Sequence, residues 1–334
     1  MTSLTQPSAS APRGASKRPV QAKSSGQWAT IWRRLKRNRL ALGGLGVLMA
    51  FVFMAIAAPL ITPEDPTHFY LGKQQLPPVW VPESPAKLVP DPQFLFGTDQ
   101  AGRDVLSRIV YGARTSVFVG IVPTLIIMLI GTTAGMLAGL FGGGLDNVLM
   151  RVVDVLEAFP DILFYIVLNV ALRDTDFGKV ASGLLLLFFS LAIVSWGGIA
   201  RLVRGTTLGL RGREFVDAAR SMGASDFFIL FKHILPNAIS IIVVWAALAM
   251  PRMIIAEATL AYLSLGMKGV TQLSESYFVT SWGQIISEGR TSLNSQPWIL
   301  LITSFCIALI VIAVTFFGNG LRDAVDPRQS SSGR

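Results

Sequence analysis

The sequence is poor in charge and in the side chains that carry most enzyme chemistry. Only 15% of its 334 residues are charged, whereas soluble domains have about a quarter. Its one cysteine, Cys306, lies in an apolar run, which excludes an intrachain disulfide and a cysteine-based metal cluster. Its two histidines, His68 and His233, lie in different polar segments, so we expect no metal site or histidine-based catalytic site.

A nucleotide-binding motif is also missing. The glycine run 142–144 is not followed by Lys-Ser or Lys-Thr, so it is no phosphate-binding P-loop. A membrane-embedded enzyme would need a nucleophile or a set of metal ligands, and the pattern offers neither. We therefore predict a chain that is not an enzyme and binds no cofactor of its own.

Long apolar runs make up most of the sequence, which is 51% hydrophobic. Runs of this length predict membrane-spanning helices, because only a helix satisfies its own backbone hydrogen bonds in lipid. The predicted fold is an all-α polytopic membrane protein with six transmembrane helices, at about 40–61, 116–140, 148–172, 182–202, 237–265 and 297–317. In the second span, Gly131, Gly135 and Gly139 recur every four residues, which predicts close packing against another helix.

The first 39 residues contain nine Lys and Arg and no acidic residue. Directly before a hydrophobic span, such a segment indicates cytosolic topology and contact with anionic membrane lipid rather than nucleic acid. The predicted regions are a disordered basic arm (1–26), an interfacial helix with the first span (27–61), an extracytoplasmic loop with an amphipathic helix capped by Thr98 (62–112), five further spans including a polar loop at 205–236 (113–322), and a cytosolic tail (323–334).

Charge also predicts the orientation. Six spans place both termini on one side of the membrane. Nineteen of the 29 Lys and Arg residues then lie with the termini, the turn after the second span and the polar loop, and nine lie opposite. The more basic side is normally cytosolic, so we expect both termini and the polar loop to face the cytosol.

The polar segment 213–237 is the most informative part of the chain. An apolar stripe at Phe215, Ala218, Ala219 and Met222 predicts a short amphipathic helix. Its charges are spaced to pair as Arg213–Asp217 and Asp217–Arg220. Gly223 is then a natural helix stop, Ser225 a plausible N-cap for a second helix, and Pro236 suits the first turn of a third.

The same segment resembles a known family. Asp217-Ala218-Ala219 is followed after three intervening residues by Gly223, and then by His233 and Leu235-Pro236. This pattern is similar to the EAA loop of ABC importer permeases. The family usually has Glu where this chain has Asp217. The segment FGTDQAGRDVLSRIVYGAR at 96–114 closely resembles a signature of oligopeptide and dipeptide permease subunits, and the His-Ile-Leu-Pro-Asn ending at 233–237 resembles the peptide and nickel branch. The resemblance covers the first span and residues 94–327.

The resemblance implies a permease subunit in the bacterial inner membrane that forms half of a translocation path for di- or oligopeptides. Nickel, glutathione or another small solute remains an alternative cargo. The implied partners are a second, homologous permease, two ABC ATPases that bind ATP and Mg²⁺, and an extracytoplasmic solute-binding protein. The residues implied to couple to the ATPase are Glu214, Asp217, Ala218, Ala219, Arg220, Gly223, Ala224, Ser225 and Asp226.

A protein of a different class, an ion-coupled secondary transporter, would show internal repeats with buried coupling charges. No clear repeat is visible, and the EAA-like loop would be unexplained.

Ionisable residues within the spans leave two questions open. Arg252 and Glu257 lie deep in the fifth span, about 140° apart around the helix, and could serve a gate or pathway, or form structural bonds to other helices. Asp154, Glu157 and Asp161 share one face of the third span. They could line the path or lie in water near the cytosolic end, and we favour the second interpretation.

Overall fold

The computed structural model describes residues 27–62, 64–83, 87–270, 272–273 and 276–325. The predicted disordered arm at 1–26 and most of the predicted tail lie outside these ranges, while residues 323–325 continue the last helix. In the described ranges every regular element is helical, apart from an isolated bridge between Thr98 and Asp104. This confirms the all-α prediction.

Within the ranges that the structure describes, five helices are long and apolar enough to cross a membrane: Arg39–Ile56, Val105–Phe141, Asp176–Ser195, Asp226–Tyr262 and Pro297–Val325. The pair α5 (Gly143–Glu157) and α6 (Asp161–Leu172) supplies a sixth span if the two are counted together, although they are bent by 87° at their junction. We expected one unbroken third span here. It is broken because Pro160 lacks a backbone N–H and directly precedes α6.

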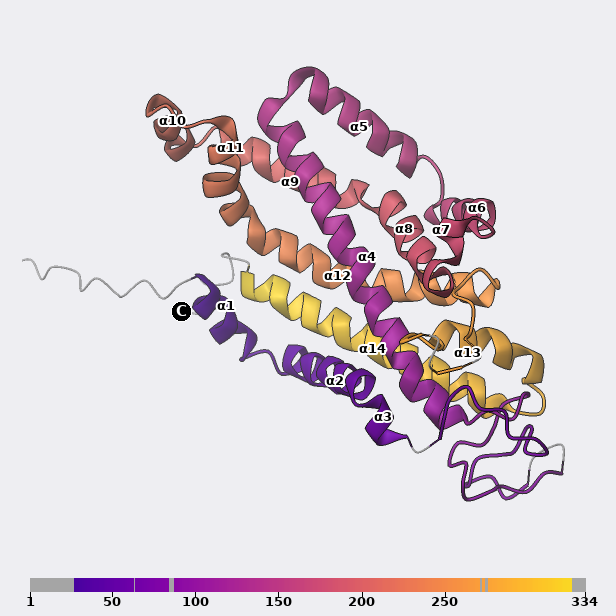
Figure 1. Ribbon diagram of the computed structural model, residues 1–334. Helices are drawn as coiled ribbons and strands as arrows, with labels where there is room; N and C mark the ends of the chain where they lie inside the picture. The colour runs from indigo at the N-terminus through magenta and orange to yellow at the C-terminus, as the bar shows by residue number, and fades with distance from the viewer. Residues whose placement is uncertain (1–26, 63, 84–86, 271, 274–275, 326–334) are drawn as a thin grey trace, which may run out of the picture.

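The two ends of the molecule differ in character (Figure 1). At one end, α10 (Glu214–Ser221) and α11 (Asp226–Ile229) project beyond the bundle, and α1 (Gln27–Leu35) and the last turns of α14 (Pro297–Val325) point the same way. At the opposite end lie α13 (Trp282–Gly289) and the irregular chain that precedes α4 (Val105–Phe141). The predicted polar loop, the first described helix and the end of the last one therefore lie at the same end of the molecule.

Glycines pack α4 against α9 (Gly197–Arg211), as the four-residue spacing predicted. A Cβ on Gly135 would lie 2.5 Å from the Ala200 carbonyl oxygen, and one on Gly139 would lie 2.6 Å from Thr207 Cβ. Neither distance is sterically possible without movement of the backbone. The α4–α9 contact thus depends on the absence of side chains at these positions.

The short α1 lies against the end of α14 and leads into α2 (Arg39–Ile56) and α3 (Ala58–Ile61). Ile31 and Leu35 are buried, whereas Trp32 is 48% exposed. Arg34 donates a hydrogen bond to the Ala324 carbonyl at the C-terminal end of α14, where the helix dipole favours a cation. The predicted helix is thus present, with one apolar face inward and an exposed Trp; its place at the membrane interface stays a prediction.

The segment before the second span differs from its prediction. Thr98 does not cap a helix: α4 begins at Val105, and its N-cap is Asp104, which accepts a hydrogen bond from Ser107 N at 2.7 Å. The helix then runs without interruption to Phe141, and Arg108 is only 2% exposed. No separate amphipathic helix lies on a membrane surface here, because the predicted stripe is simply the buried first part of a long spanning helix.

Ion pairs and a tryptophan hydrogen bond connect α13 and the irregular chain before α4 to the helix bundle. Arg108 contacts Asp99 at 2.5 Å and Glu288 at 2.7 Å, and Arg103 contacts Glu288 at 2.6 Å. The fully buried Trp282 donates from its indole to the Ile109 carbonyl at 2.8 Å. The loop predicted at 266–296 therefore contains a docked helix.

Candidate functional site: the projecting tip and an internal cavity

The projecting tip, which we define as residues 213–235, has the predicted sequence of helix, turn and helix. Gly223 has a φ of +84°, a left-handed conformation that L side chains rarely adopt. Ser225 caps α11 by accepting a hydrogen bond from Phe228 N at 3.3 Å. A short π-helix at Leu230–Ile234 then leads into α12 (Leu235–Tyr262), whose first turn holds Pro236. These boundaries confirm the prediction from sequence.

The faces of α10 differ from the predicted stripe. Val216 and Ala219 are buried and belong to the same apolar cluster as Ile229, whereas Phe215 is 41% and Met222 82% exposed. That face is covered by the chain itself: it belongs to the main apolar core, and α10 contacts α9. The predicted short helix is present, but of the four stripe residues only Ala219 is buried.

The exposed face of the tip is strongly apolar. Phe227, Phe228 and Phe231 are 62%, 51% and 61% exposed, and Met222 is 82% exposed. Single exposed apolar residues are ordinary, but a cluster of large ones on a projecting element indicates an interaction surface. Ala218 is also exposed here, while Ala219 is not.

The charges of the tip pair differently from the prediction. Arg220 lies 3.5 Å from Asp226 across the Gly223 turn, so it joins α10 to α11. Within the described residues, Asp217 forms neither the Arg213 nor the Arg220 pair. Glu214 and Asp217 instead occupy the first turn of α10, where negative charge is favourable to the helix dipole.

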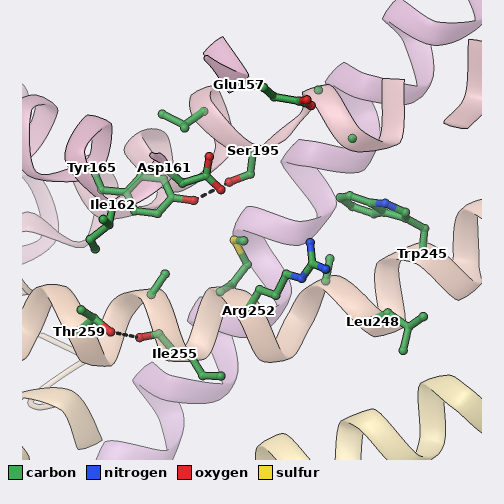
Figure 2. A pocket seen from close by; sticks show the side chains of 16 residues that line it. Glu157, Asp161, Ile162, Tyr165, Ser195, Trp245, Leu248, Arg252, Ile255 and Thr259 are labelled. Atoms are coloured by element: carbon green, nitrogen blue, oxygen red, sulfur yellow. Dashed lines mark hydrogen bonds between the residues drawn. The ribbon is translucent and has the colours of Figure 1, made fainter. Parts of the chain in front are cut away.

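A cavity of about 680 Å³ lies between α12 and the break that separates α5 from α6 (Figure 2). The α12 wall contributes the stripe Trp245, Leu248, Arg252, Ile255 and Thr259. The opposite wall carries Glu157, Asp161 and Tyr165, and the Tyr165 hydroxyl is 2.6 Å from Ser195 Oγ on α8 (Leu184–Ser195). The bend at Pro160 creates this space, because it turns α6 away from the line of α5.

The three carboxylates predicted to share a helix face are separated by this bend. Arg201 contacts Asp154 at 2.8 Å and also Glu157. Gly197 leaves room for that arrangement, since a Cβ there would lie 2.6 Å from Glu157 Oε1. Asp161 follows the break and lines the cavity with Glu157, whereas Asp154 does not. The expectation of a single face was therefore wrong, because Pro160 ends α5.

Arg252 and Glu257 face different surroundings, as their angular separation predicted. Arg252 is exposed to the cavity, and Figure 2 shows its guanidinium extending from α12 into the space between α12 and the opposite wall. Glu257 is 1% exposed and accepts a 2.6 Å hydrogen bond from Ser281 Oγ at the start of α13. Its observed contact thus joins α12 to α13 and does not line the cavity.

Comparison with known proteins places these features in a family. Residues 131–331 match the model described as "Binding-protein-dependent transport system inner membrane component", and residues 26–78 match "N-terminal TM domain of oligopeptide transport permease C". The chain belongs to this family of transport-system permeases. Its fold also resembles the MetNI methionine ABC transporter in inward-facing conformations, with a TM-score of 0.51 at 19% identity over 65% of this chain and 96% of that one.

Several named permeases are similar over nearly their whole length. The dipeptide transport system permease protein DppC of Bacillus subtilis is 37% identical, covering 89% of this permease and 84% of the relative. The oligopeptide transport system permease protein OppC of Escherichia coli K12 is 35% identical, with coverage of 90% and 91%. The glutathione transport system permease protein GsiD of Pectobacterium atrosepticum is 37% identical, with coverage of 91% and 92%.

Sequence reasoning identified the tip and Arg252 but missed most of the cavity wall. Trp245, Leu248, Ile255 and Thr259 lie on the helix face that carries Arg252, so following that face at helical spacing would have found them. The sequence pattern did not indicate that Tyr165 and Ser195 line the cavity, since their contact depends on the bend before α6. In the described part of this permease, no group of three metal-binding side chains occurs.

Proposed function

We propose that this chain is one of two permease subunits in an ATP-driven importer of di- or oligopeptides, and that its tip receives movement from an ATPase subunit in the cytosol. The observation that carries the proposal is the tip itself. Four large apolar side chains, Met222, Phe227, Phe228 and Phe231, are at least half exposed on an element that projects from the bundle. A short helical element with an apolar face fits a groove on a partner protein.

The orientation is part of this proposal. The tip, α1 and the end of α14 lie at one end of the molecule, and the sequence puts most of the basic residues there. Since the basic side of a membrane protein is normally cytosolic, the tip meets ATPase subunits inside. The α13 end then faces outward, toward a solute-binding protein.

The cavity supplies half of the translocation path. It is bounded by α12 and the α5–α6 bend in this chain, and the second permease closes its remaining side. Rotation of packed helices, driven through the tip, opens it alternately to the two sides of the membrane. ATP and Mg²⁺ are bound by the ATPase partners, which supply the energy that this chain lacks.

Peptides are the favoured cargo because the dipeptide and oligopeptide permeases resemble this chain over nearly their full length. Glutathione is the second candidate, since a glutathione permease is equally similar. The test is uptake into proteoliposomes that contain the complete complex and its binding protein. We expect accumulation of di- or oligopeptides that requires internal ATP. Uptake of glutathione alone would favour the second candidate, and uptake driven by an ion gradient without ATP would refute both.

A further inference from the structure

Two opposite charges in the cavity have no protein partner within the described chain. Arg252 on α12 and Asp161 in the first turn of α6 both line the cavity and are both exposed to it. Among the described residues, neither forms an ion pair or a side-chain hydrogen bond. Glu157, the other carboxylate there, is already held by Arg201. One cation and one anion therefore remain available to a molecule in the cavity.

Such charges are costly within a membrane protein unless they meet water or an opposite charge. Arg252 and Asp161 come from facing walls of the cavity (Figure 2). Apolar side chains such as Trp245, Ile162 and Met253 line the same space. A cavity with one cation, one anion and apolar walls complements a small zwitterion that has an apolar side chain.

We propose that Arg252 binds the C-terminal carboxylate of a small peptide in transit, and that Asp161 binds its N-terminal ammonium group. The guanidinium presents paired N–H donors that match the two oxygens of a carboxylate. The volume of about 680 Å³ lies within the range of small-molecule sites. This proposal deepens the proposed function, on which it rests, by assigning the chemistry that recognises the cargo inside the membrane.

The test measures binding without ATP and without the binding protein, so that it depends on the permease alone. The permease pair with its ATPases is placed in lipid nanodiscs and titrated with alanyl-alanine or with its C-terminal amide. Trp245 lines the cavity and reports binding by a change in fluorescence, which Trp245→Phe identifies. For the wild type, we expect the free dipeptide to bind roughly tenfold more tightly than the amide, as a charge-assisted hydrogen bond provides.

The variants assign each charge. Arg252→Gln should remove the preference for the free carboxylate, whereas Arg252→Lys should keep part of it. Asp161→Asn should instead remove the preference for alanyl-alanine over its N-acetyl form. Arg151→Gln is the matched control, since Arg151 is exposed on α5 and does not line this cavity, and it should leave both preferences intact.

Equal binding of the acid and the amide by the wild type would overturn the proposal, as would an unchanged preference in Arg252→Gln. No saturable signal in any form would also overturn it. These outcomes are separate from failure of the proposed function, which would appear as absence of ATP-dependent uptake by the wild-type complex in proteoliposomes.

Discussion

At the scale of single residues, Gly223 fixes the shape of the tip. Its φ of +84° is accessible to glycine at little cost, and an added Cβ would meet no atom within 4 Å. The constraint is therefore backbone conformation and not space. Asn tolerates this conformation far better than a β-branched residue does.

We expect Gly223→Val to cost about 1–2 kcal/mol locally, to misplace α11 relative to α10, and to reduce ATP-dependent uptake strongly without reducing the amount of protein in the membrane. Gly223→Asn is the control and should retain most uptake. The measurement is initial uptake rate in proteoliposomes, with membrane insertion checked for both variants. Normal uptake by the valine variant would show that the shape of this turn is not needed.

Glu288 is a second residue whose chemistry can be tested. Desolvation opposes its ionisation, but Arg108 and Arg103 outweigh that cost and lower the pKa of Glu288 below its ordinary value. A carboxyl group with a lowered pKa stabilises the fold above its unfolded pKa, and this contribution is lost as the pH falls through the folded value.

Glu288→Gln should therefore lower the melting temperature by a few degrees at neutral pH, and the difference from wild type should shrink as the pH falls into the acid range. Thermal unfolding of the purified complex at a series of pH values measures this. Glu83→Gln is the control, because Glu83 is exposed in the same outer region and lies outside this ion-pair network. If the difference in melting temperature between variant and wild type stayed constant with pH, the charge of Glu288 would not contribute to stability.

At the scale of elements, the contact between α4 and α9 is governed by glycine. Gly135→Val should push the two helices apart, at a cost of about 1–3 kcal/mol or more, because its side chain would meet the backbone of Ala200. Gly209→Val on α9 is the matched control, since a Cβ there would meet nothing within 4 Å. Thermal unfolding should show a lower melting temperature for the first variant only. Equal decreases in melting temperature for the two variants would mean that a change in helix propensity, and not packing against α9, explains the lower stability.

Elements also show where sequence reasoning succeeds and where it fails. The glycine row, the cap at Ser225 and the turn at Gly223 were predictable because each depends on local backbone chemistry. The 87° bend before α6 was not predicted, because Pro160 could equally have kinked a continuous span slightly. The buried face of α10 was also missed, since which face is covered depends on how α10 packs against the rest of the chain and not on the spacing of apolar residues.

The candidate cavity shows the same division. Arg252 and Glu257 were recognisable as charges within an apolar run, and their separation around the helix predicted different surroundings. Which of them faces the cavity could not be predicted, because that depends on the neighbours of α12. The structure places α13 beside Glu257, through Ser281, and the open space beside Arg252.

At the scale of the whole molecule, the proposed orientation puts the two ends of the helix bundle on opposite sides of the membrane. The tip and the end of α14 lie at one end of the molecule. At the other end lie α13 and the irregular chain that precedes α4. In the proposed function, force from an ATPase acts at the tip and reaches the cavity through α9 and α12, the helices that flank the tip in the chain and also line the cavity. This arrangement explains why a chain with no nucleotide-binding motif can take part in ATP-driven import.

The most direct measurement is cysteine labelling, which is practical because the chain has a single native cysteine, Cys306, to remove. After Cys306→Ser, a new cysteine is placed at Met222 on the tip or at Leu71 at the other end, where the side chains are 82% and 89% exposed. In intact cells, a membrane-impermeant maleimide should label Leu71→Cys and not Met222→Cys. A photoreactive maleimide on Met222→Cys should cross-link to the ATPase subunit. Labelling of Met222→Cys from outside, or the absence of that cross-link in an assembled complex, would contradict the account.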